Sequence, residues 1–124
     1  MHAWLCTNPV GVDALAWTEL PTPAPKAGEV LIEIKAASLN FPDLLIVQNK
    51  YQFKPALPFV PGSEYAGVVQ ALGDGVRHLK IGQAVACLSG TGGFGTHTVA
   101  KAALCLPLPQ GMPFVDAAAF IMIY

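Results

Sequence analysis

Glycine and proline recur along the whole chain and leave little room for a long helix. The 124 residues include 12 glycines and 11 prolines. Proline is tolerated only in the first turn of a helix, and glycine weakens a helix interior. Residues 21–28 alone hold three prolines and end in Gly28, which favours an extended loop. Interruption at this rate is typical of short strands joined by turns, so the sequence predicts a mainly β domain with short helices.

The segments between these breaks alternate in hydrophobicity as strands do. The clearest is 29–37, where Val30, Ile32 and Ile34 share one face. We expect further strands at 3–7, 14–20, 65–72, 83–88, 96–100 and 104–106, with 83–88 and 96–100 paired across a glycine loop. A short helix is expected over 42–48, which carries Pro42 in its first turn. A second helix should begin at residue 113 or 114.

Charged residues are scarce, at 12%, while hydrophobic residues make up 53%. A typical soluble domain has about 25% charged residues, so we expect apolar surface that meets another domain or subunit. The alternative is a well-buried β-rich domain. The net charge of −1 offers no basic surface for nucleic acid or an anionic membrane. No apolar run reaches the roughly 18 residues that a membrane span needs.

Three cysteines, Cys6, Cys87 and Cys105, lie far apart in the sequence. Their odd number and wide spacing predict neither a disulfide framework nor a cysteine metal site. The first residues lack the basic and apolar regions of a signal peptide. A reducing, cytoplasmic setting is therefore expected.

Residues 90–95, Gly-Thr-Gly-Gly-Phe-Gly, fit the dinucleotide-binding pattern Gly-x-Gly-x-x-Gly. That pattern works only where it opens a helix whose N-terminus meets the pyrophosphate. The residues that follow, Thr96 to Ala100, are β-branched and alternating. No acidic residue lies about 20 positions downstream within a βαβ unit. We interpret the segment as a hairpin loop whose glycines supply positive φ angles.

The stretch from Pro61 to Gly67 reads Pro-Gly-x-Glu-x-x-Gly and runs into an apolar segment. A second motif, Asn40-x-x-Asp43, precedes it. Together with matching segments in the same order and spacing, these motifs resemble the zinc-free quinone oxidoreductases of the medium-chain dehydrogenase/reductase superfamily. The matching segments are 36–44, Tyr51, 57–62, 92–94 and 107–109.

This resemblance implies a GroES-like, partly open β-barrel. The catalytic domain would cover residues 1–112, and 113–124 would start an interdomain helix. The Rossmann cofactor domain of such enzymes follows in sequence and is absent from this chain; the apolar, uncapped end at residues 123–124 favours the same interpretation. The implied reaction is hydride transfer from NADPH to a quinone or enone, in a parent enzyme that is a homodimer. The domain alone is then expected to be inactive.

Zinc enzymes of the superfamily are similar but carry a Cys where this chain has Asn40 and a His where it has Ser63. An amide and a hydroxyl are poor zinc ligands, so we expect no metal. Hydrogen-bond donors must then stabilise the negative charge that builds on the acceptor oxygen.

The resemblance assigns that task to Tyr51 and Asn40, as catalytic and cofactor-binding residues, and puts Ser63 in the substrate cleft. Each has a plainer alternative. Tyr51 could pack over the barrel, Asn40 could cap the helix, and Ser63 could be a small turn residue. Asp43 and Glu64 are expected to be structural.

Three other functions stay open at this point. The first is an enoyl-thioester reductase of the same superfamily, in which a tyrosine is thought to donate a proton. The second is a co-chaperonin-like or other binding module built on the same barrel. The third is a naturally short, inactive domain.

Overall fold

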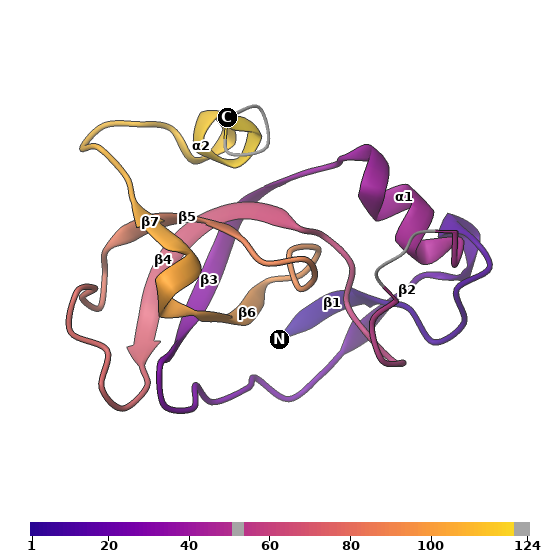
Figure 1. The fold of residues 1–124 in the computed structure, drawn as a ribbon, viewed down its shortest axis with the longest axis horizontal. Coiled ribbons are helices and arrows are strands. Elements are labelled where there is room, and N and C mark those ends of the chain that lie inside the picture. The colour runs from indigo at the N-terminus through magenta and orange to yellow at the C-terminus, as the bar shows by residue number, and fades with distance from the viewer. Residues whose placement is uncertain (51–53, 121–124) are drawn as a thin grey trace.

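A five-stranded antiparallel sheet forms the body of the domain, and a two-stranded hairpin lies beside it (Figure 1). The computed structural model describes residues 1–50 and 54–120. The larger sheet has the order β6-β3-β4-β5-β7. Its strands are β3 (Glu29–Ser38), β4 (Glu64–Leu72), β5 (Ala84–Leu88), β6 (His97–Lys101) and β7 (Cys105–Pro107). The hairpin pairs β1 (His2–Leu5) with β2 (Ala16–Glu19).

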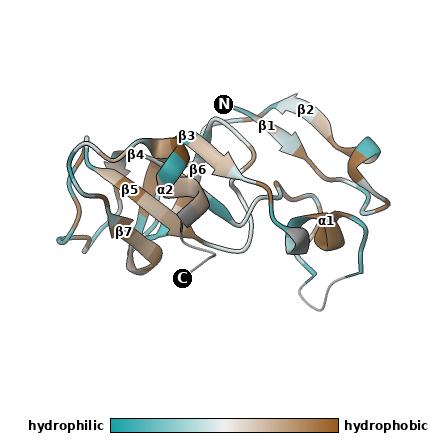
Figure 2. Cartoon of the chain, turned by 90° about the horizontal axis from the view of Figure 1, so that it is seen from above, coloured by the Kyte–Doolittle hydropathy of each residue, from teal (hydrophilic) through white to brown (hydrophobic). Residues whose placement is uncertain are grey.

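Two short α-helices, α1 (Phe41–Val47) and α2 (Phe114–Phe120), complete the fold with two 3-10 turns, Val12–Ala14 and Ala102–Leu104. Figure 2 shows α1 beside the hairpin and α2 against the larger sheet. Within the described residues neither sheet closes on itself. The expectation of a mainly β domain with short helices is confirmed, and the open sheets agree with a partly open barrel.

The core lies on one face of the larger sheet and follows from the alternation in β3. Val30 and Ile32 are fully buried, and Ile34 packs against the same cluster. Tyr65 and Val69 of β4 join them there. On the side of the sheet that α2 covers, the buried side chains are small: Ala66, Ala86, Ala117 and Ala118 pack together, and the partly buried Leu108, Met112 and Phe114 pack against them. These contacts hold α2 close to the backbone of the sheet.

The expected pairing of 83–88 with 96–100 is wrong. β5 pairs with β4 on one side and with β7 on the other, so both of its edges are occupied. β6 instead pairs with β3 at the opposite edge of the sheet. Alternation identifies a strand but not its partner, because the pattern is the same whichever edge the strand joins.

The glycine-rich segment 90–95 therefore crosses from the inner strand β5 to the edge strand β6 and is not a hairpin loop. It leads into strand β6 and not into a helix, as its sequence predicts. Gly90 and Gly92 have positive φ angles, as expected.

The two glycines of the Pro-Gly-x-Glu-x-x-Gly motif are required by close approach. A Cβ on Gly67 would lie 2.1 Å from the carbonyl oxygen of Glu33 in the neighbouring strand. Gly62 has a φ of +106°, and a Cβ there would lie 2.8 Å from the amide nitrogen of Phe94. The motif thus lets β4 and the segment before it pass unusually close to two other parts of the chain.

Candidate active-site cleft

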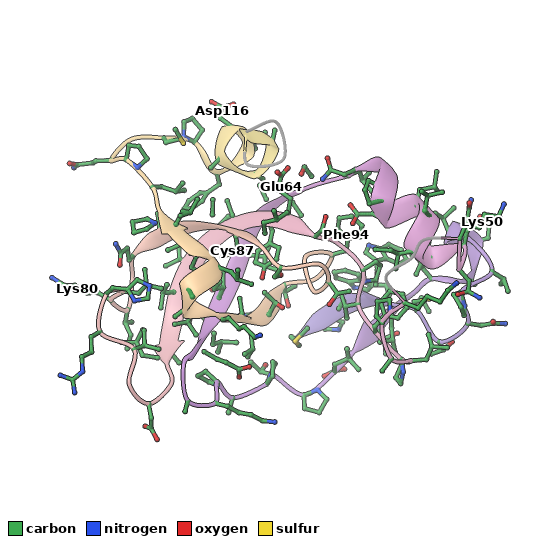
Figure 3. All side chains as sticks on the ribbon, in the orientation of Figure 1. Lys50, Glu64, Lys80, Cys87, Phe94 and Asp116 are labelled. Atoms are coloured by element: carbon green, nitrogen blue, oxygen red, sulfur yellow. The ribbon has the colours of Figure 1, made fainter. Side chains whose placement is uncertain are left out.

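A cleft of about 910 Å³ opens between the hairpin, β3, α1 and the segment Gly93 to Gly95. Its volume falls within the range of small-molecule sites, about 300–1,000 Å³. Most of its lining side chains are apolar, including Trp4, Trp17, Ile34, Leu39, Leu44, Val47 and Phe94. Figure 3 shows Phe94 on the side of the sheet that faces α1 and the hairpin. Lys35, Asn40 and Asp43 are the charged and amide residues of the lining.

Asn40 occupies the N-cap position of α1, with an extended backbone. Its N–H donates to Oδ2 of Asp43 (3.0 Å), and the Asp43 N–H donates to the Asn40 carbonyl (3.0 Å). Pro42 near the helix start needs no hydrogen-bond acceptor for its nitrogen. Asn40 is therefore both the predicted N-cap and a residue of the cleft.

Asp43 joins the two positions that the sequence singled out. Its second oxygen, Oδ1, accepts a hydrogen bond from the Ser63 N–H at 3.1 Å. Only 2% of Asp43 is exposed, and this burial raises the pKa of its carboxyl above the usual value, while the N–H groups of Asn40 and Ser63 oppose the shift. One buried carboxyl thus fixes the distance between the start of α1 and the start of β4.

Ser63 lies behind this carboxyl and does not line the cleft. The residue is buried, and its Oγ has no hydrogen-bond partner among the described residues. The structure therefore brings Asn40 and Ser63 together through Asp43 while giving only Asn40 a direct place in the lining.

The Asn40 side chain is held by a residue that the sequence did not single out. Its Nδ2 donates to Ser38 Oγ at 3.2 Å. The Ser38 hydroxyl also contacts Oε1 of Glu64 and lies 3.0 Å from the carbonyl oxygen of Ala118 in α2. Ser38 and Glu64 are directly opposite each other in β3 and β4, and Figure 3 shows Glu64 beneath α2. This network orients the amide and ties the cleft to α2.

Two tryptophans form one wall of the cleft, and sequence reasoning had not assigned them a role. Trp4 and Trp17 face each other across the hairpin, with ring centroids 5.4 Å apart at 58°. They are 44% and 50% exposed, and the His2 ring stacks on Trp17 at 5.9 Å. Their positions in two short strands gave no signal of this role, because only the fold turns the hairpin toward α1.

Tyr51, the third predicted site residue, lies outside the described residues, so its role stays a prediction. Within residues 1–50 and 54–120, no three His, Cys, Asp or Glu side chains gather closely enough to bind a metal ion. The donor groups at the two positions compared with zinc enzymes are an amide and a hydroxyl, a set that does not suit zinc. In the same ranges, every helix is too short or too polar to cross a bilayer.

Comparison with known proteins gives consistent results. Residues 26–110 match the family described as the alcohol dehydrogenase GroES-like domain. The chain is 36% identical over 103 residues to the quinone oxidoreductase of Rattus norvegicus, covering 82% of this chain and 31% of that protein. A crystal structure of the human synaptic vesicle membrane protein VAT-1 homolog-like protein superposes with a TM-score of 0.93 at 34% identity, over 98% of this chain and 40% of that one.

The Escherichia coli quinone oxidoreductase complexed with NADPH superposes with a TM-score of 0.89 at 33% identity. That match covers 97% of this chain and 37% of the bacterial chain. The chain thus spans between about a third and two fifths of the length of these three relatives.

Proposed function

Because this chain belongs to the alcohol dehydrogenase GroES-like domain family, and its relatives are quinone oxidoreductases and VAT-1 proteins of the medium-chain dehydrogenase/reductase superfamily, we propose that it is the catalytic domain of a zinc-independent, NADPH-dependent quinone oxidoreductase. The observation that carries this proposal is the apolar cleft with Asn40 in its lining, where Asp43 holds Asn40 and Ser63 by their backbone N–H groups. The catalytic domain would be residues 1–112, and residues 113–124 would start the interdomain helix.

Zinc independence is supported by the hydrogen bonds of the Asp43 carboxyl. The Asp43 carboxyl, which contacts both compared positions, already accepts hydrogen bonds from two N–H groups. Asn40 in turn uses its Nδ2 on Ser38. A cation would have to displace these hydrogen bonds and would gain only an amide and a hydroxyl as further ligands.

The cleft residues have separate roles in the proposed reaction. The rings of Trp4 and Trp17, with Phe94, would contact a planar acceptor and exclude water from it. Asn40 and Tyr51 would hydrogen-bond the acceptor oxygen and the nicotinamide side of the site. NADPH, when bound, supplies the hydride. Most of its contacts would come from a cofactor-binding domain, so the activity, the homodimer and a cytoplasmic location are proposals for the whole enzyme.

The first test uses the two tryptophans, because the chain has only these two and both line the cleft. Titration with 1,4-naphthoquinone is expected to quench their fluorescence saturably, with a dissociation constant of roughly 10 µM to 1 mM for a ligand of this size. The fluorescence lifetime should stay constant, as static quenching requires. Leu44→Ser, in the cleft, should weaken binding, whereas Ile81→Ser, exposed away from it, should not.

Linear quenching equal to that of N-acetyltryptophanamide would contradict cleft binding. Crotonyl pantetheine separates the two reductase hypotheses. If the thioester displaces the quinone and binds more tightly, the enoyl-thioester reductase replaces the quinone oxidoreductase as the better function. Assembly of the chain into a ring in light scattering would favour the co-chaperonin-like module.

A second prediction concerns the cofactor. The 124-residue chain is expected to catalyse no measurable NADPH oxidation with quinone, because the N-terminus of α1 in the described cleft is already capped by the Asp43 carboxyl and is not free to bind a phosphate. Isothermal titration calorimetry should detect no NADPH binding tighter than about 100 µM. Micromolar binding by this chain would show that residues 1–124 hold the cofactor by themselves. It would overturn the proposal that a separate domain makes most of the contacts with NADPH.

A further inference from the structure

Cys87 and Cys105 meet in the core, although they are 18 positions apart in the sequence. They are directly opposite each other in β5 and β7, and their sulfur atoms lie 3.0 Å apart. Cys87 is 0% exposed and Cys105 is 3% exposed. Figure 3 shows Cys87 within the larger sheet, and neither residue lines the cleft. The pair therefore has no part in the proposed reductase site.

The geometry of the pair suits a covalent bond. Opposite residues in an antiparallel sheet have Cα atoms about 4.5–5.5 Å apart, and a disulfide accepts about 4.4–6.8 Å. A disulfide bond is about 2.05 Å long, so the two sulfur atoms need to approach by only about 1 Å. The backbone can stay in register while the bond forms.

The two thiols are chemically different. The Cys87 thiol donates a hydrogen bond to the sulfur of Cys105. This bond lowers the pKa of Cys105 and raises that of Cys87. Because the thiolate is the reactive form of cysteine, Cys105 is the thiol of the pair that reacts first with an oxidant.

Access to Cys105 comes from the edge of the sheet. β7 is only three residues long and is the last strand of its sheet, and its other residues, Leu106 and Pro107, are exposed. Short edge strands open locally at low cost in free energy, without unfolding of the core. Such opening exposes Cys105 and leaves Cys87 on β5, which β4 still pairs.

We propose that Cys87 and Cys105 are a redox-active dithiol that hydrogen peroxide converts into an intramolecular disulfide. The Cys105 thiolate attacks one peroxide oxygen, the O–O bond breaks, and hydroxide leaves and is protonated to water. Cys105 is then a sulfenic acid. The Cys87 sulfur attacks the Cys105 sulfur, the S–O bond breaks, and a second water leaves with the Cys87 proton. Two thiols and one peroxide thus give one disulfide and two waters, and a small dithiol reverses the change.

The test is intact-mass spectrometry of the folded chain after peroxide treatment and alkylation with N-ethylmaleimide in urea. The wild-type chain is expected to lose about 2 Da, the two thiol hydrogens, and to keep one alkylatable cysteine. Peptide mapping should place the bond between 87 and 105. Dithiothreitol should restore three alkylatable thiols.

Cys6 provides the matched control, since it is also buried but packs with Ile46 and Phe59 in a different cluster. Cys6→Ser should form the disulfide as the wild type does, and Cys87→Ser should form none. Because a core serine could unfold the sheet, Cys87→Ala is the second variant, checked by circular dichroism. Three alkylatable thiols in the folded wild type, at a peroxide dose that oxidises the urea-unfolded chain, would overturn the proposal. A disulfide to Cys6 would overturn it as well.

Discussion

Replacing Asp43 with alanine is expected to lower the free energy of unfolding by about 2–4 kcal/mol. The side chain is 2% exposed and accepts hydrogen bonds from the N–H groups of Asn40 and Ser63. Alanine leaves both donors without the carboxyl and removes an acidic residue from the first turn of α1. Urea denaturation followed by circular dichroism measures the difference.

Asp116 is the matched control, because it holds the same third position in α2 but is exposed. Asp116→Ala should cost less than about 1 kcal/mol, the value of a charge near a helix end. Equal effects of the two substitutions would contradict a special role for Asp43.

The cost of Asp43→Ala should also depend on pH. Burial raises the folded-state pKa of Asp43 above its ordinary value of 3.8. A raised carboxyl pKa contributes stability that is fully present below the unfolded-state pKa and is lost as pH rises through the folded-state pKa. The difference between wild type and Asp43→Ala should therefore be largest at acid pH and fall to a plateau at neutral pH. A difference that grows with pH would mean that the ionised form is the favoured one.

Replacing Gly67 with alanine is expected to cost about 3 kcal/mol or more. The new Cβ would lie 2.1 Å from the Glu33 carbonyl oxygen and 2.9 Å from Cγ2 of Ile32. The closest of these atoms belongs to the backbone of β3, which pairs with β4, so it cannot move aside as the end of a flexible side chain could. The strands must separate where Val30 and Ile32 build the core, and the thermal unfolding temperature should fall accordingly.

Gly75→Ala is the control for this substitution. Gly75 has a φ of +82° but open space around its Cβ position. Alanine there should cost only about 1 kcal/mol, the strain of a left-handed backbone without a clash. A Gly67→Ala variant as stable as Gly75→Ala would show that β3 and β4 can separate freely.

The strands were predictable wherever one face is buried. β3 alternates cleanly because Val30 and Ile32 point into the core, and α1 was marked by Asn40, Pro42 and Asp43. The partners of β5 and β6 were not predictable, since a strand's own residues do not say which edge it joins. The Cys87–Cys105 contact was not predictable for the same reason, because it depends on the pairing of β5 with β7.

The candidate site was predictable only in part. Asn40 was found through its motif, and the structure gives it a place in the cleft lining. Ser63 was placed in the cleft by resemblance, but its position behind Asp43 depends on how α1 meets β4. Trp4 belongs to no motif, and Ser38 lies in the matching segment 36–44 without a role of its own there, because their roles come from cross-strand register and from the orientation of the hairpin.

The segment 90–95 has a consequence for the order of folding. Its backbone groups bond to Trp4 near the start of the chain and to Val60, Pro61 and Gly62 in its middle. These partners lie about 30 and about 90 positions away along the chain, so loop-closure entropy delays their contact with the segment. The hairpin β1–β2 is too small to persist alone in water, and the Trp4 N–H bond to the Phe94 carbonyl, one of its anchors, forms only when this segment reaches it. We therefore expect the cleft to be assembled in a late, cooperative step, after the larger sheet has formed.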